Sequence, residues 1–151
     1  MLANYKGNAY QVSYMSDKTI TVRSRKYIEG AKKHSDGKGI YYQLNMRHKQ
    51  YRLFDVCFSA VYKEHLFRAM KLDGEKVLLV TYDPNVKAKL DVYTGFHRIT
   101  GEHYYIYADG KAIDRFTLET NYPQDNVSRH KTINYSEFKQ LWQKYYVDTR
   151  Y

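Results

Sequence analysis

The fold is decided by residues 58–83, which read FSAVYKEHLFRAMKLDGEKVLLVTYD. The first half of this stretch fits an amphipathic helix, because its apolar residues recur roughly every 3.6 positions. A comparison within the chain favours strands instead: Tyr62-Lys63-Glu64-His65-Leu66-Phe67 aligns with Tyr5-Lys6-Gly7-Asn8-Ala9-Tyr10, 57 positions earlier. The same offset places Ile20 on Val77 and Val22 on Leu79. We therefore predict strands in this stretch, with a hairpin turn at Asp73-Gly74, since Asp-Gly is a strong hairpin signal.

The earlier segment of this comparison also has the pattern of a hairpin. Apolar and polar residues alternate in residues 10–14 and 19–23, and Ser16-Asp17 forms a turn between them. Farther along, residues 40–44 resemble residues 103–107 at an offset near 63, which a loop insertion explains. The sequence therefore predicts two degenerate β-hairpin repeats, residues 5–52 and 61–116, that pack as one body within a single domain, residues 1–151.

The remaining segments complete a β-rich fold of the α+β class with a C-terminal helix. Pro84 is placed to begin a short helical turn, whereas residues 28–38 read as a loop and residues 119–132 as a polar connection. The helix is expected at about residues 134–146, because Asn134 can cap it and Glu137 can reach back to the cap. Its apolar stripe should dock on the sheet and consists of Phe138, Leu141, Trp142 and Tyr145.

Positive charge is concentrated in the first third of the chain. Lysines and arginines number 25 against 16 aspartates and glutamates, and residues 18–52 alone hold ten basic residues and two acidic ones. A charge imbalance of this kind steers a partner of negative sign toward the basic surface. The alternative interpretation is a solvated basic surface that serves solubility.

The cysteine content and the hydropathy pattern indicate a cytoplasmic protein. The single cysteine, Cys57, lies in an apolar run and cannot form an internal disulfide, which favours a reducing compartment. The sequence opens without the apolar core of a signal peptide, and no apolar run reaches the roughly 18 residues that would cross a bilayer. We therefore expect no membrane partner.

No motif in the chain predicts catalysis, a metal or a cofactor. The six histidines are scattered without the spacing of metal ligands. Gly37-Lys38-Gly39 has the composition of a phosphate-binding loop but lacks the further residues of the Walker pattern. We expect that the chain is not an enzyme and has no catalytic residue.

Basic residues interleaved with aromatic residues form the candidate partner-binding site. Single-stranded nucleic acids bind to such surfaces, because bases stack on rings while cations contact phosphates. Protein interfaces prefer the same residue types, because tyrosine and arginine bury large areas and still form hydrogen bonds. Both alternatives remain open, with an acidic protein partner favoured. Tyr27 is the expected anchor of the site, which comprises Arg23, Arg25, Lys26, Tyr27, Lys32, Lys33, Arg47 and His48.

Several segments resemble small immunity proteins that are encoded beside polymorphic or type VII secreted toxins in Gram-positive bacteria. They are the opener Tyr5-Lys6-Gly7, residues 62–70, Asp73-Gly74, residues 77–83, Tyr104-Tyr105 and Ala112-Ile113-Asp114. The resemblance extends to about Phe116 and implies a cytoplasmic inhibitor that neutralises a cognate toxin by direct binding. Because the chain is basic, the toxin it implies is acidic or acts on something other than nucleic acid. The second copy departs from the pattern at Glu64, where the opener has glycine, and the C-terminal helix has no counterpart.

Overall fold

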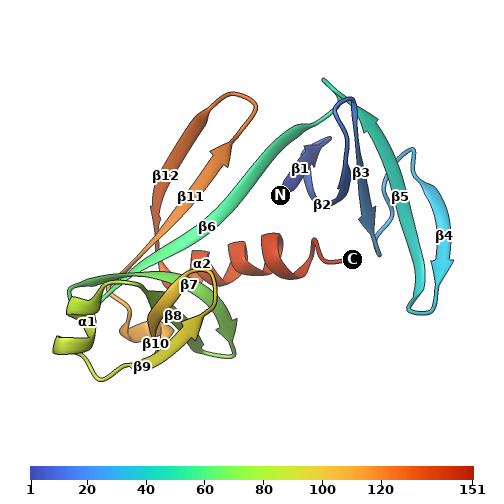
Figure 1. The fold of residues 1–151 in the computed structure, drawn as a ribbon. Helices are drawn as coiled ribbons and strands as arrows, with labels where there is room; N and C mark the ends of the chain where they lie inside the picture. The colour runs from blue at the N-terminus through green and yellow to red at the C-terminus, as the bar shows by residue number, and fades with distance from the viewer. The chain divides into compact units, whose positions relative to one another are not determined.

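A computed structural model describes all 151 residues of the chain (Figure 1). Strands make up 58% of it and helices 15%, which confirms the predicted β-rich class with a C-terminal helix. The chain divides into two compact units. Unit 1 comprises residues 1–55, 120–128 and 143–151, and unit 2 comprises residues 56–119 and 129–142. The packing of both copies into one body stays a prediction.

Twelve strands and four short helical segments follow one another along the chain. The strands of the first half are β1 Leu2–Tyr5, β2 Asn8–Met15, β3 Thr19–Ser24, β4 Lys32–Asp36, β5 Gly39–Arg47 and β6 Arg52–Tyr62. Those of the second half are β7 His65–Asp73, β8 Lys76–Thr81, β9 Tyr93–His97, β10 Gly101–Asp109, β11 Arg115–Tyr122 and β12 Val127–Ile133. The helical segments are α1 Pro84–Lys89, the 3₁₀ turn η1 Gly110–Ala112, α2 Tyr135–Trp142 and the π-helical turn η2 Gln143–Val147.

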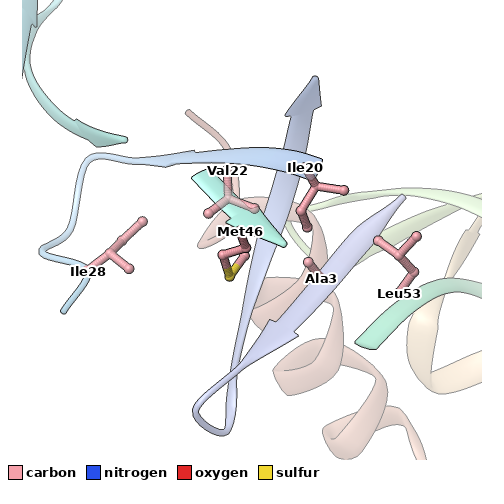
Figure 2. Close-up of a cluster of buried hydrophobic side chains, with 6 residues drawn as sticks. All are labelled: Ala3, Ile20, Val22, Ile28, Met46 and Leu53. Atoms are coloured by element: carbon pink, nitrogen blue, oxygen red, sulfur yellow. The ribbon is translucent and has the colours of Figure 1, made fainter. Parts of the chain in front are cut away.

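Unit 1 is an antiparallel sheet in the strand order β4-β5-β3-β2-β1, with β1 also pairing with the first residues of β6. Alternation along β3 buries Ile20 and Val22 on one face, where β5 places Met46 opposite Ile20. These side chains form the core of the unit, which Figure 2 shows: Ala3, Ile20, Val22, Ile28, Met46 and Leu53. Each large aliphatic side chain buried in this way contributes about 1.5–3 kcal/mol to stability.

Unit 2 is an antiparallel sheet in the strand order β6-β7-β8-β10-β9. Within this unit α2 buries Phe138 and Trp142, and the ring of Phe138 stacks on Phe116 with centroids 4.3 Å apart and lies edge-on to Phe58 at 5.1 Å. The predicted cap of α2 is confirmed. The Asn134 side chain accepts a hydrogen bond from the Glu137 amide at 2.8 Å, and the Glu137 carboxylate accepts one from the Asn134 amide at 3.3 Å.

The helical alternative for residues 58–70 is excluded, because these residues form the end of β6 and most of β7. Leu66 is 67% exposed and Phe67 is 2% exposed, as neighbours on opposite faces of a strand should be. The hairpins β2–β3 and β7–β8 and the helical turn α1 with Pro84 at its first position are also confirmed. The turn of β7–β8 is Gly74-Glu75, one residue later than predicted, because Asp73 still pairs with Lys76.

Corresponding features recur in the two units at the predicted offset of 57. The turns Lys6-Gly7 and Lys63-Glu64 both have positive φ at their two central residues. The register of β2 against β3 shifts between Val12 and Tyr14, and that of β7 against β8 shifts between Ala69 and Lys71, 57 positions later. These matches support the two-copy interpretation, which stays a prediction.

The strands β5 and β10 can also be compared through the residues with which they pair. Tyr42 pairs with Ser24 in unit 1, and Tyr104 pairs with Thr81 in unit 2, so β5 corresponds to β10 at an offset of 62. This offset is close to the value near 63 found by sequence comparison, and the two-copy interpretation stays a prediction.

Two segments predicted to be irregular are strands. Residues 32–36 form β4 at the sheet edge. All five side chains are polar and exposed, so the sequence shows no alternation of apolar and polar residues that would predict a strand. Residues 119–132 were predicted to be a polar connection but contain most of the hairpin β11–β12, whose turn is residues 123–126. The C-terminal helix changes character after Trp142 and continues as the π-helical turn η2.

Candidate functional site

The predicted site residues lie at three places in unit 1. Since Ile20, Val22 and Ser24 are buried, alternation along β3 places Arg23 on the opposite face, which we call the outer face. Arg23 pairs with Gln43 of β5, which in turn pairs with Lys32 of β4, so these residues lie on the same face. Tyr41 of β5 and His34 of β4 form the next pair on this face. Lys26 and Tyr27 follow β3 and line a pocket, Lys33 lies on the opposite face of β4 from Lys32, and Arg47 and His48 lie at the far end of β5.

A cluster of arginine and tyrosine side chains occupies one end of the outer face. We call it the Arg–Tyr cluster and define it as Arg23, Arg25, Asp36, Tyr41 and Tyr151. The guanidinium carbon of Arg25 lies 4.7 Å from the centroid of the Tyr151 ring, and that of Arg23 lies 5.4 Å from the same centroid. Both guanidinium groups also lie over the ring of Tyr41, at 5.8 and 5.5 Å, and the two tyrosine rings meet edge to face at 4.9 Å.

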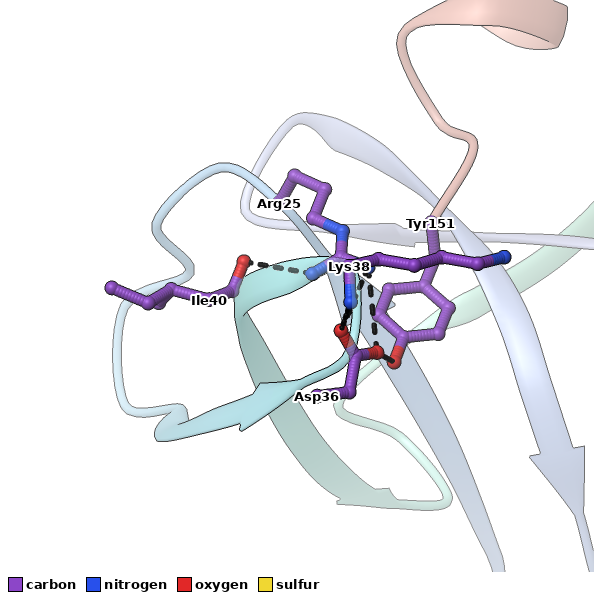
Figure 3. Close-up of polar contacts among 5 residues, drawn as sticks. All are labelled: Arg25, Asp36, Lys38, Ile40 and Tyr151. Atoms are coloured by element: carbon purple, nitrogen blue, oxygen red, sulfur yellow. Dashed lines mark hydrogen bonds and ion pairs between the residues drawn. The ribbon is translucent and has the colours of Figure 1, made fainter.

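Hydrogen bonds fix the orientation of each cation in the cluster. Arg23 donates from Nε to the side-chain oxygen of Gln43 at 2.8 Å. Arg25 donates to the carbonyl oxygen of Ile40 at 3.1 Å and to the Asp36 carboxylate at 3.2 Å (Figure 3). The side chain of Arg25 remains 29% exposed and that of Asp36 31% exposed. The two arginines therefore form a partly dehydrated platform on which an aromatic ring rests.

Asp36 organises the polar side of the cluster. Its carboxylate accepts hydrogen bonds from the Tyr151 hydroxyl at 2.5 Å, from the Lys38 amide at 2.8 Å and from Arg25 (Figure 3). These donors, with the Tyr151 hydroxyl the strongest influence, lower the pKa of Asp36. The hydrogen bond to Asp36 in turn raises the pKa of Tyr151.

Tyr27 stands beside a small pocket of about 270 Å³ at the end of β3. Its ring is 68% exposed and meets Tyr42 edge to face, with centroids 5.4 Å apart. Lys26 faces Asp148 across the pocket at 3.9 Å, and Lys144 contributes a second ammonium group. An exposed aromatic ring that packs against a second ring and lies beside lysines is typical of an anchor residue in a protein interface.

Arg47 and His48 belong to a separate region at the far end of β5, where His48 lines a groove of about 350 Å³ together with Arg52 and Asp125. Arg52 pairs with Asp125 at 2.9 Å and lies 3.8 Å from the centroid of the Tyr122 ring. The structure thus brings Arg23 and Arg25 together, places Lys26 and Tyr27 at a neighbouring pocket, and separates Arg47 and His48 from both groups.

Sequence reasoning missed Asp36 and Tyr151 as members of the site. Asp36 follows two lysines in a polar run, and its role depends on the pairing of β4 with β5, which the sequence pattern did not reveal. Tyr151 lies 115 positions from Asp36, so no local spacing could connect them. Tyr41 could have been identified from the sequence, because it is an aromatic residue in a predicted strand that is flanked by basic residues.

Charge differs strongly between the two units. Unit 1 contains 13 lysines and arginines against 6 aspartates and glutamates, whereas unit 2 contains 12 against 10. Five members of the candidate site are exposed cations of unit 1: Lys26, Lys32, Lys33, Arg47 and, when protonated, His48. A partner of negative charge would be steered to this unit.

No family model, curated protein or solved structure matches the chain. Within the chain, no group of three or more histidine, cysteine, aspartate or glutamate side chains is arranged to hold a metal ion. None of the helices has the length and apolar character needed to cross a membrane.

Proposed function

We propose that the chain is a non-catalytic binding protein of the immunity type, which acts in the cytoplasm and neutralises a cognate secreted toxin by binding it directly. The observation that carries this proposal is the concentration of exposed cations and exposed tyrosine in unit 1. Tyr27 is the proposed anchor, and three exposed lysines of the same unit, which we call the rim, are the charges proposed to attract an acidic partner: Lys26, Lys32 and Lys33. The resemblance of the openers Tyr5-Lys6-Gly7 and Tyr62-Lys63 to immunity proteins supports the same function.

Arg25, a predicted member of the partner-binding site, also has structural contacts within the Arg–Tyr cluster. It holds Asp36 and the Ile40 carbonyl, so a change of Arg25 alters the local structure as well as the surface charge. The rim is therefore best tested through exposed lysines whose removal leaves the Arg–Tyr cluster intact.

The first test uses the protein encoded beside this chain. The two should copurify as a stable complex when they are coexpressed, and coexpression should abolish the toxicity of the neighbouring protein. If the neighbouring protein is toxic and neither is rescued by this chain nor copurifies with it, the immunity proposal is wrong.

The second test locates the interface. Reversal of the rim in the triple variant Lys26→Glu, Lys32→Glu, Lys33→Glu should slow association with the partner by about tenfold or more at low salt, because rim charges mainly set the association rate. Thermal stability should change little, since exposed charges contribute little to it. The matched control reverses three exposed cations of unit 2, Lys87, Lys89 and Arg98. If only the control variant slows association, the interface lies on unit 2.

Single-stranded nucleic acid is the second candidate partner. It is favoured by one observation, the ring of His34 stacked on Tyr41 at 5.3 Å with Arg23 beside it, because such rings offer faces on which bases stack. An oligonucleotide of mixed sequence should then bind with an affinity that falls steeply with salt, since phosphate contacts release counterions. Tyr41→Ala should weaken this binding, whereas Tyr93→Ala in unit 2 should not.

A further inference from the structure

The Arg–Tyr cluster has the composition of a receptor for a phenol ring. Two guanidinium groups lie over the face of the Tyr151 ring, the edge of Tyr41 meets it, and the Asp36 carboxylate accepts its hydroxyl hydrogen. Each of these contacts selects a different property of tyrosine. Cations select the electron-rich face of the ring, and the carboxylate selects the hydroxyl group over a plain phenyl ring.

The fold does not require this cluster. Unit 2 has the same strand order and matching registers, and its corresponding positions hold different chemistry. Val80 and Tyr82 stand where unit 1 has Arg23 and Arg25, while His103 and His97 stand where it has Tyr41 and Asp36. The same arrangement of strands therefore forms without paired arginines or a carboxylate, and the cluster is an addition specific to unit 1.

The Tyr151 side chain is held by side chains and not by the sheet itself. It reaches the cluster from outside the strands, and the ladder formed by β3, β5 and β4 is complete without it. The groups that contact its ring come from β4, β5, β3 and the residue after β3. The two arginines, Tyr41 and Asp36 therefore lie on or beside strands whose pairing does not involve Tyr151.

We infer that the outer face of unit 1 carries a tyrosine-binding site, formed by Arg23, Arg25, Asp36 and Tyr41, which Tyr151 of the same chain fills. This inference goes beyond the proposed function, because it concerns which side chain the site accepts and holds for any partner of the chain. A free tyrosine derivative should enter the site when Tyr151 is replaced.

The experiment titrates the full-length chain with N-acetyl-tyrosinamide and follows the side-chain N–H signals of Arg23 and Arg25 by NMR. Tyr151→Ala should bind the probe with a dissociation constant on the order of 1–10 mM, as expected for cation–π contacts plus one charge-assisted hydrogen bond. The unmodified chain should bind at least five times more weakly, since its own ring competes. Tyr151→Phe, which keeps the ring and loses the hydrogen bond, should lie between them.

Three controls make the result specific. Tyr14→Ala removes another exposed tyrosine of unit 1 and should leave probe binding as weak as in the unmodified chain. N-acetyl-phenylalaninamide should bind Tyr151→Ala several-fold more weakly than the tyrosine probe, and this preference should vanish when Asp36→Asn is added. N-acetyl-leucinamide should cause no shift of the arginine signals.

Several outcomes would overturn the inference. They are equal binding of the tyrosine probe by the unmodified chain and Tyr151→Ala, absence of binding to Tyr151→Ala at about 20 mM probe, and equal shifts with the leucine probe. Should Tyr151→Ala fail to fold, the comparison of Tyr151→Phe with the unmodified chain decides. Stronger binding to Tyr151→Phe supports the site, and equal or weaker binding contradicts it.

Discussion

Tyr151 and Asp36 share one hydrogen bond, and each changes the pKa of the other. Because the folded-state pKa of Tyr151 is raised above its ordinary value of 10.0, the contact contributes fully below pH 10 and is lost as the pH rises through the raised pKa. Because the pKa of Asp36 is lowered from 3.8, its contribution is present above that pH and is lost as the pH falls through the lowered pKa.

We therefore predict that the Tyr151 contact persists between about pH 4 and pH 10. The ¹³Cζ signal of Tyr151, assigned with Tyr151→Phe, should titrate above pH 10.0, and the carboxyl carbon of Asp36 should titrate below pH 3.8. In Asp36→Asn the pKa of Tyr151 should return toward its ordinary value. An unchanged Tyr151 titration in that variant would show that the hydrogen bond does not set its pKa.

Gly110 of unit 2 leaves room for the ring of Tyr135. A Cβ atom at this position would collide with the ring carbons of Tyr135, whose hydroxyl donates to the Glu75 carboxylate at 2.6 Å. Burial, followed by this hydrogen bond, raises the pKa of Tyr135 to about 12. Glycine is thus required at position 110 because the Tyr135 ring approaches its Cα closely, and not because the residue has a positive φ.

Gly110→Ala should destabilise the protein by about 1–3 kcal/mol, because the ring must move and its hydrogen bond to Glu75 is strained. Urea unfolding measures the change. The matched control is Gly37→Ala, since a Cβ atom added at Gly37 would meet no atom within 4 Å and the residue lacks a positive φ. Equal stability of the two variants would contradict this account of Gly110.

The β1–β2 turn at Lys6-Gly7 and the β6–β7 turn at Lys63-Glu64 differ in how well their residues suit the backbone conformation. Both central residues have positive φ in each turn, with φ of 49° and 80° at Lys6-Gly7 and 46° and 68° at Lys63-Glu64. Such turns match the twist of a two-residue hairpin but favour glycine, because a side chain at positive φ is strained. Glu64 is thus less suitable for its position than Gly7, the second central residue of the β1–β2 turn.

Glu64→Gly should stabilise the protein by about 0.5–1 kcal/mol, and Gly7→Glu should destabilise it by about 1–2 kcal/mol. Thermal unfolding monitored by circular dichroism measures both. Glu64→Ala controls for the loss of charge, because it keeps a Cβ atom at positive φ and should give little gain. A gain in Glu64→Ala as large as that in Glu64→Gly would assign the effect to charge.

Strands with apolar alternation and a turn residue at the right place could be predicted from the sequence, as β2, β3, β7 and β8 were. β4 could not, because an edge strand with five exposed residues has no buried face to impose alternation. The helix α2 could be predicted from its cap and its stripe, since both signals are local.

Only those parts of the candidate site whose residues lie close together in the sequence could be predicted. Arg23 and Arg25 drew attention as basic residues near tyrosines, but their joint contact with Tyr41 depends on the pairing of β3 with β5. The contact of Tyr151 with Asp36 joins residues 115 positions apart and depends on side-chain placement that no periodicity encodes. The rim lysines Lys26, Lys32 and Lys33, by contrast, are all exposed, as charged residues usually are.

The unequal charge of the two units leads to a prediction about binding kinetics. Unit 1 has a formal excess of seven positive charges and unit 2 an excess of two. If unit 1 binds an acidic protein, the association rate should fall as salt is raised from about 0.01 M to 0.15 M, because the screening length shrinks from about 30 Å to about 8 Å. The dissociation rate should change little, since it is controlled by the anchor Tyr27, which the partner would bury.

Stopped-flow measurements across this salt range check the prediction. The triple variant Lys26→Glu, Lys32→Glu, Lys33→Glu should flatten the salt dependence of association, and the triple variant of Lys87, Lys89 and Arg98 should preserve it. A salt dependence that is the same in both variants would mean that steering comes from the whole chain and not from unit 1.

The position of Tyr151 in the chain has a consequence for protein synthesis. The strands β1 to β5, which supply Arg23, Asp36 and Tyr41, are translated by residue 47, whereas the ring that fills their cluster is added at residue 151. At about 5–20 residues per second, the ribosome needs roughly 5–20 s to cover that distance. During this interval the nascent chain contains the residues of the proposed site without the tyrosine that fills it.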